Sequence, residues 1–128
     1  TLAPGFATHD VGHAPDGRIW ITSGSGRELA VGGLVQPADL APQHVTFGRG
    51  VAYVTSGDSG TLHVHAHDGR VLRRTPVPAG SYNVQFGHGL VITASLSQGT
   101  LAVLDRRGAL LQVLRVAGSC HDACFLPL

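Results

Sequence analysis

The sequence contains no methionine and no lysine, so that all nine of its basic residues are arginine. It has only two cysteines, and no apolar run approaches the ~18 residues that a membrane-spanning helix requires. The formal net charge is +1, so no strong field of one sign favours nucleic acid or an anionic lipid surface as a partner. Because no methionine begins the chain, we expect that Thr1 is not the start of the gene product.

Glycine and hydrophobic residues are plentiful. The 128 residues include 18 glycines and 7 prolines, which indicates many tight turns, and the hydrophobic share of 43% suffices for the packed core of one domain. The apolar residues form short runs rich in β-formers, such as Ile19-Trp20-Ile21, and no stretch has helical periodicity. The sequence therefore predicts an all-β protein of short strands.

An internal repeat organises the chain. Residues 43–81 read QHVTFGRGVAYVTSGDSGTLHVHAHDGRVLRRTPVPAGS, and the next stretch, from Tyr82, repeats them as YNVQFGHGLVITASLSQGTLAVLDRRGALLQVLRVAGS. An earlier copy begins at His9, and a further copy begins at His121 and stops with the chain. A period of about 40 residues made of short β runs is typical of propeller blades.

We therefore predict an all-β propeller with about three four-stranded blades and one extra inner strand. The predicted blades are 9–42, 43–81 and 82–120, and the extra strand covers 121–126. Within the second blade we expect strands at 43–47, 51–56, 61–67 and 70–77, and within the third at 82–86, 90–94, 100–105 and 109–116. In the first blade we expect a third strand over 28–34, and the two prolines of 36–42 make the fourth strand short or missing.

Two motifs resemble a known family. Tyr53-Val54-Thr55-Ser56-Gly57 and Ala14-Pro15-Asp16-Gly17-Arg18 look like the Y-V-T-N element and the upstream turn of the YVTN/YncE-like β-propeller repeats. The resemblance covers residues 9–126 and implies an extracytoplasmic or cell-surface location. More distant propellers include lactonases and a streptogramin lyase. The chain departs from the motif at Ser56, where the family has Asn.

The length departs from the family more seriously. Propellers have about 4–8 blades, and three blades with one strand leave two open radial faces. The missing blades come either from the rest of a longer chain or from a second copy, which would complete a ring of six as a homodimer. The terminal His121-Asp122 pair mimics His9-Asp10, so the last strand could be exchanged between copies.

The strongest candidate site is a ring of polar residues at the mouth of the axial channel, since the inner strands of all blades begin there. Its members are His9, Asp10, Gln43, His44, Tyr82, Asn83, His121 and Asp122. Histidines and carboxylates that meet in a concave site can bind a ligand or a metal or transfer protons. Alternatively these groups only cap strand ends. Lactonase propellers hold a channel metal with Glu, Asn and Asp, and this ring has no Glu.

A second candidate is His63-Val64-His65-Ala66-His67. Alternate residues of a strand share a face, so His63, His65 and His67 could hold a zinc-type ion there, or could simply be ordinary residues of that face. Cys120 and Cys124 are too far apart on an extended strand to form a disulfide, and we expect them to be buried thiols. The Gly-Ser loops have no following helix and no lysine, which excludes a phosphate-binding loop of the Walker type.

These observations favour a binding or interaction scaffold with a polar channel mouth for an unknown small molecule or protein. A metal-dependent hydrolase or lyase that acts at the mouth is the alternative, and a structural cell-surface repeat protein is a third reading. We expect no cofactor under the first reading and a divalent metal under the second.

Overall fold

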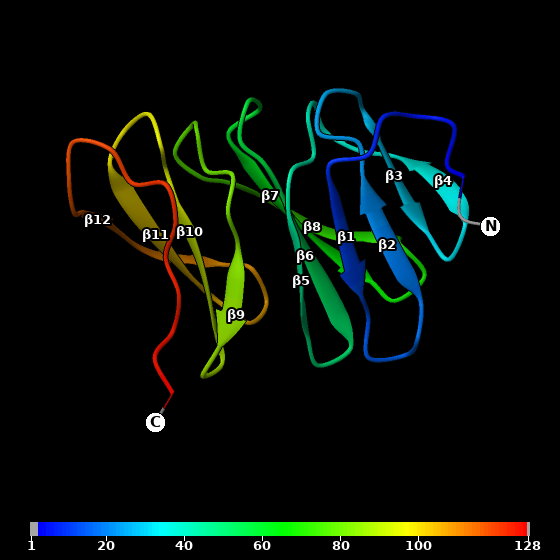
Figure 1. Ribbon diagram of the computed structural model, residues 1–128. Helices are drawn as coiled ribbons and strands as arrows, with labels where there is room; N and C mark the ends of the chain where they lie inside the picture. The colour runs from blue at the N-terminus through cyan, green and yellow to red at the C-terminus, as the bar shows by residue number, and fades with distance from the viewer. Residues whose placement is uncertain (1–2, 128) are drawn as a thin grey trace.

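The computed structural model describes residues 3–127, which form three four-stranded antiparallel sheets (Figure 1). Each sheet contains four consecutive strands in their order along the chain. The first sheet comprises β1 (Asp10–His13), β2 (Ile19–Thr22), β3 (Glu28–Val31) and β4 (Leu34–Pro37). The second comprises β5 (Val45–Gly48), β6 (Val51–Ser56), β7 (Thr61–Ala66) and β8 (Val71–Pro76). The third comprises β9 (Gln85–Gly87), β10 (Leu90–Ala94), β11 (Thr100–Asp105) and β12 (Leu110–Arg115).

The sheets stand side by side in the manner of propeller blades. The first strands β1, β5 and β9 are neighbours, while β4, β8 and β12 form the opposite edges (Figure 1). The prediction of an all-β partial propeller with four-stranded blades is confirmed. Within the described range, no helix is long and apolar enough to cross a membrane.

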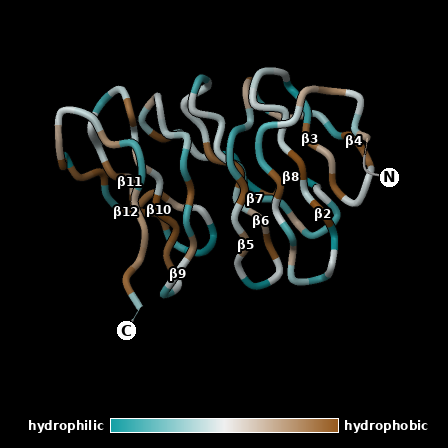
Figure 2. Tube along the Cα trace, viewed as in Figure 1, coloured by the Kyte–Doolittle hydropathy of each residue, from teal (hydrophilic) through white to brown (hydrophobic). Residues whose placement is uncertain are grey.

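Two hydrophobic clusters hold the sheets together, and the middle sheet contributes to both. Tyr53 points toward the third sheet with Leu62 and Val64, whereas Ala52 and Val54 point toward the first sheet. This follows from the period of two along a strand, which sends neighbouring side chains of β6 to opposite faces. Apolar colour therefore runs along the central strands of each sheet (Figure 2).

A repeated hydrogen bond joins each sheet to the next. The Thr22 hydroxyl donates to the carbonyl of Gln43 at 2.6 Å, and the Thr55 hydroxyl donates in the same way to the carbonyl of Tyr82. Both threonines are buried at the end of the second strand of their sheet. In the third sheet Ala94 occupies the equivalent position and has no hydroxyl to donate.

The first sheet has a short fourth strand, one of the two predicted alternatives, but the bounds of its third and fourth strands differ from the prediction. The chain turns at Gly32 and Gly33, with φ of 57° and 87°, so the predicted long strand over 28–34 is divided into β3 and β4. Two consecutive residues with positive φ make the tight turn that suits a two-residue hairpin. The fourth strand is therefore present, and Pro37 is its last residue, where the missing N–H does little harm.

The predicted extra strand over 121–126 is not a strand in the structure. A strand needs a hydrogen-bonding neighbour, and no other described strand pairs with this segment. The segment instead passes β9 in an extended course, with the Phe125 ring 5.4 Å from that of His88.

Candidate functional site

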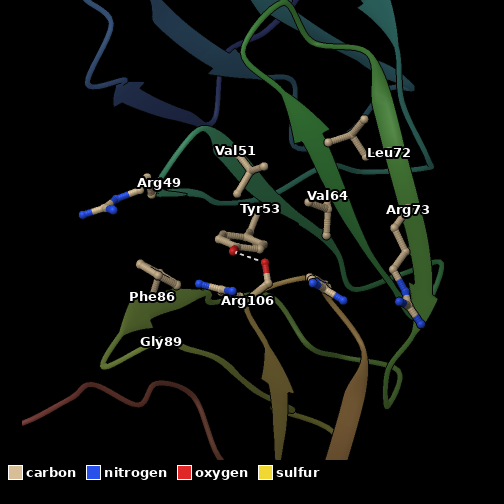
Figure 3. Close-up of a pocket in the computed structure, with 10 residues that line it drawn as sticks. Arg49, Val51, Tyr53, Val64, Leu72, Arg73, Phe86, Gly89 and Arg106 are labelled. Carbon is tan, nitrogen blue, oxygen red and sulfur yellow. Dashed lines mark hydrogen bonds between the residues drawn. The ribbon is translucent and has the colours of Figure 1, made fainter.

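A hollow of about 820 Å³ lies between the second and third sheets. It opens where the turns after β5, β9 and β11 meet, which is the end of the sheets opposite to the predicted channel mouth (Figure 3). Its lining residues are Arg49, Val51, Tyr53, Val64, Leu72, Arg73, Phe86, Gly89, Arg106 and Arg107. An apolar wall is thus combined with four guanidinium groups, which is the composition of a site for a small organic molecule.

The floor of the hollow is aromatic. The Tyr53 and Phe86 rings are stacked, with centroids 5.5 Å apart and an interplanar angle of 20°. Tyr53 is fully buried, and its hydroxyl donates to the carbonyl of Arg106 at 2.5 Å (Figure 3). Burial raises the pKa of Tyr53, so this phenol stays protonated and remains a donor. The bond ties the turn after β11 to the middle sheet.

The turn itself is shaped by Asp105 and Gly108. The Asp105 Oδ1 accepts the backbone N–H groups of Arg107 at 2.8 Å and Ala109 at 2.9 Å. The pKa of Asp105 lies below its usual value, chiefly because of the hydrogen bond from the Ala109 N–H. The hydrogen bond from Arg107 and the charges of Arg73 and Arg107 lower it in the same direction. Gly108 has φ of 83° and lies so close to Val64 that a Cβ would be 2.5 Å from Cγ2 of that valine. The turn therefore presents its two arginines in a defined place.

Part of the predicted polar ring is assembled at the other end of the sheets. The His9 and His44 rings lie edge to face with centroids 5.1 Å apart. The His44 Nδ1 is 3.2 Å from Oδ2 of Asp10, which also accepts the Val45 N–H at 3.2 Å. The beginnings of β1 and β5 therefore bring two histidines and one carboxylate together.

The other members of the ring have separate partners. The Gln43 amide donates to the carbonyl of Gly24 at 2.9 Å, and the Tyr82 hydroxyl donates to Oδ1 of Asp58 at 2.7 Å. The Tyr82–Asp58 hydrogen bond also raises the pKa of the phenol. Asn83 is half-buried, and its Oδ1 has no hydrogen-bond partner among the described residues.

Among residues 3–127, neither His121 nor Asp122 forms a hydrogen bond or ion pair with another member of the ring. His121 and Asp122 are exposed, and the Asp122 carboxylate accepts only the adjacent Ala123 N–H at 2.7 Å. The expectation of buried thiols was wrong, since Cys124 is exposed and Cys120 is half-buried. The reason is that no sheet packs over this segment. Both thiols are free.

The three histidines of the second sheet have different environments. His63 and His65 share the face of β7 toward the first sheet, with ring centroids 5.6 Å apart. The His63 Nε2 lies 3.1 Å from Asp39, whereas the His65 Nδ1 donates to the carbonyl of Gly69 at 2.8 Å. His67 follows the end of the strand and turns to Asp16 of the first sheet.

No metal centre is assembled from these groups. Among residues 3–127 no three or more His, Cys, Asp or Glu side chains are placed to hold a metal ion. The alternation rule correctly placed His63 and His65 on one face, but it does not extend to His67, because β7 ends at Ala66.

Sequence reasoning missed the hollow between the sheets. One signal was available, the pair Arg106-Arg107, which replaces His67-Asp68 of the preceding repeat at the same turn. The net charge of +1 gave no sign of this local positive charge, because acidic residues elsewhere in the chain balance the four arginines of the hollow.

Comparison with known proteins shows the fold. No family model and no curated protein matches the chain. Among solved structures it is similar to a catalytically inactive virginiamycin B lyase from Staphylococcus aureus with quinupristin, at 15% identity and a TM-score of 0.75, with 91% of this chain and 43% of that chain covered. It is also similar to Kuenenia stuttgartiensis hydrazine synthase, at 14% identity and a TM-score of 0.78, with 94% of this chain and 38% of that chain covered. Apo AztD from Citrobacter koseri is similar at 13% identity and a TM-score of 0.72, with 94% of this chain and 38% of that chain covered.

The chain thus spans about four-tenths of the length of these structures. At 13–15% identity the likeness shows the architecture and no activity. The lyase and AztD are β-propellers, so this chain has the fold of part of a β-propeller.

Proposed function

We propose that the chain is the ligand-binding part of a β-propeller and that a small organic molecule binds in the hollow between the second and third sheets. The single observation that carries this proposal is the contrast between two equivalent places. The hollow between the second and third sheets measures about 820 Å³, whereas the pocket at the equivalent place between the first and second sheets measures about 10 Å³. Pockets for small ligands typically measure about 300–1,000 Å³.

The contrast has a local cause. In the first gap the Trp20 indole packs edge to face against Phe47 and His65, with centroids 5.9 and 5.6 Å apart. In the second gap Tyr53 occupies the position of Trp20, lies flat against Phe86 and leaves the end of the gap open. The same fold is thus filled at one interface and hollow at the next.

The test uses N-phenyl-1-naphthylamine, a neutral dye whose fluorescence rises in an apolar pocket. Leu72 is half-exposed on β8 and lines the hollow, so Leu72→Trp should fill part of it and weaken dye binding. Leu111 on β12 is similarly exposed and lies outside the lining, which makes Leu111→Trp the matched control. Equal binding by both variants, or no binding by the wild type, would contradict the proposal.

Catalysis at the channel mouth is the second candidate, as a lyase or hydrolase. The juxtaposition of His9, His44 and Asp10 favours it, because imidazole and carboxylate groups within hydrogen-bond reach of each other are the usual groups of general acid–base catalysis. One similar structure is a virginiamycin B lyase with quinupristin, which motivates a lyase assay with quinupristin as the test substrate. Any such activity should disappear in His44→Ala while dye binding in the hollow persists. The reading as a purely structural repeat protein predicts neither activity nor dye binding.

Ring completion belongs to the same proposal. Three sheets are fewer than the 4–8 blades of a closed propeller, so further blades are supplied by a second copy or by the rest of a longer chain. Light scattering after size exclusion tests the first source: a homodimer has twice the chain mass of 13.3 kDa. A monomer would assign the remaining blades to a longer chain. The propeller fold and the motif at Tyr53 also favour membership of the YVTN/YncE-like family and an extracytoplasmic location.

A further inference from the structure

The two gaps between sheets are built from equivalent turns but carry opposite charge patterns. In the first gap Asp16, in the turn after β1, faces His67, in the turn after β7, with Oδ2 and Nδ1 3.0 Å apart. Arg18 reinforces this closure, because its guanidinium donates to the carbonyl of His67 at 2.6 Å. Two hydrogen bonds therefore join the two turns across the first gap.

In the second gap the equivalent positions carry like charges. Arg49 precedes Gly50 in the turn after β5, as Asp16 precedes Gly17 in the turn after β1. Arg106 follows β11 in the way that His67 follows β7. Two guanidinium groups repel, so no side-chain ion pair closes this gap as it does the first.

Two more arginines strengthen the positive charge. Arg73 stands on β8 at the side of the hollow, and Arg107 follows Arg106 (Figure 3). Among the described residues, no carboxylate lies within 4.0 Å of a guanidinium nitrogen of any of these four arginines. Asp105 is the acid of the adjacent turn, and its Oδ1 is engaged by two backbone N–H groups. Four of the nine arginines thus surround one apolar hollow.

This arrangement selects the charge of the occupant. We propose that the hollow binds a small organic anion, a molecule with an apolar body and a sulfonate, phosphate or carboxylate group. The body contacts Phe86, Val51 and Leu72, and the acidic group bridges Arg106 and its neighbours, which takes the place of the Asp16–His67 contact of the first gap. Guanidinium groups bind such oxyanions with paired, charge-assisted hydrogen bonds. The inference rests on the proposed function and adds the class of ligand.

A pair of dyes separates the two claims. 8-Anilinonaphthalene-1-sulfonate has the same ring system as N-phenyl-1-naphthylamine and adds one sulfonate. Both are titrated by fluorescence into the wild type, into Arg106→Gln/Arg107→Gln and into Arg27→Gln/Arg115→Gln. The last pair is exposed and lies outside the hollow, so it removes the same charge without touching the site. Far-UV circular dichroism and urea unfolding check that all three proteins are folded.

We expect the sulfonate to bind the wild type more tightly than the neutral dye, and raised salt to reduce that preference, since the arginines are exposed. The Arg106/Arg107 pair of substitutions should weaken sulfonate binding roughly fivefold and leave the neutral dye unchanged. The Arg27/Arg115 pair should change neither.

Equal affinity for the two dyes, or equal effects of the two double substitutions, overturns the anion inference and leaves the proposed hollow intact. Failure of both dyes to bind the wild type overturns the proposed function itself. Persistence of sulfonate binding in Leu72→Trp places the anion elsewhere and also overturns the inference.

Discussion

Acid should destabilise this fold through His65, and the effect can be worked out from its surroundings. His65 is fully buried against Trp20, with Nδ1–H bonded to the carbonyl of Gly69 and no partner for Nε2 among the described residues. Burial lowers the pKa of His65 from 6.5 to about 4, a net shift that includes the opposing hydrogen bond to Gly69 and a smaller lowering by the nearby His63. Protonation would add a charge at Nε2 where nothing can accept its proton.

The direction follows from proton binding. Between pH 6.5 and pH 4 the unfolded chain holds a proton on this histidine and the folded chain does not, so stability falls as the pH falls. The contribution of the neutral, buried His65 to the free energy of unfolding is complete above pH 6.5 and is lost progressively as the pH falls to 4. The shift corresponds to about 3 kcal/mol in total, of which roughly 2 kcal/mol is lost between pH 7.5 and pH 5. Burial also lowers the pKa of His63, despite the opposing charge of Asp39, which adds in the same direction.

The assay is urea unfolding at a series of pH values from 7.5 to 5. His65→Leu should flatten the profile, and the third repeat offers precedent, because Leu104 fills the equivalent position and is fully buried. His88→Gln is the control, since His88 is exposed. His65→Leu loses the hydrogen bond to Gly69 at every pH, so the quantity compared is the slope of the free energy of unfolding against pH and not its absolute value. Equal slopes in the wild type and His65→Leu would refute the reasoning.

Three further outcomes follow from single contacts. Thr22→Val should lower the free energy of unfolding by about 1 kcal/mol, because the carbonyl of Gln43 loses the hydroxyl that donates to it, and thermal unfolding measures the loss. Gly108→Ala should cost at least 1 kcal/mol in urea unfolding, since the positive φ and the 2.5 Å approach to Val64 both oppose a Cβ. Cys124 should react rapidly with a thiol reagent in the folded protein, a result that slow labelling by mass spectrometry would contradict.

The strand pattern was largely predictable because it depends on local chemistry. Turns such as Asp68-Gly69 and Arg49-Gly50 separate the predicted strands of the second blade, and the apolar run at 51–54 suits the sheet packed on both faces that the structure shows. The error at 28–34 arose from treating Gly32-Gly33 as part of a strand, although paired glycines favour a turn. The strand predicted over 121–126 failed for another reason, since a strand requires a neighbour that the described residues do not supply.

The candidate sites depended on distances that no single repeat contains. The repeat correctly suggested that the starts of inner strands meet, and His9, Asp10 and His44 do so. It could not show that Tyr82 turns to Asp58. The hollow could not be predicted from the sequence for the same reason, because it depends on how Tyr53 packs against Phe86 of the next sheet.

The sequence by itself determined the blade architecture, because turn residues and the period of two act within a few residues of one another. The tertiary structure decided which of two equivalent gaps is closed and which is hollow. That outcome depends on pairs such as Asp16 with His67 and Tyr53 with Phe86, which lie about one repeat apart and meet only when the sheets pack. A hydrogen bond spans the first gap and the stacking of Tyr53 on Phe86 leaves the second open, because contacts of both kinds depend on distance in space and not along the chain.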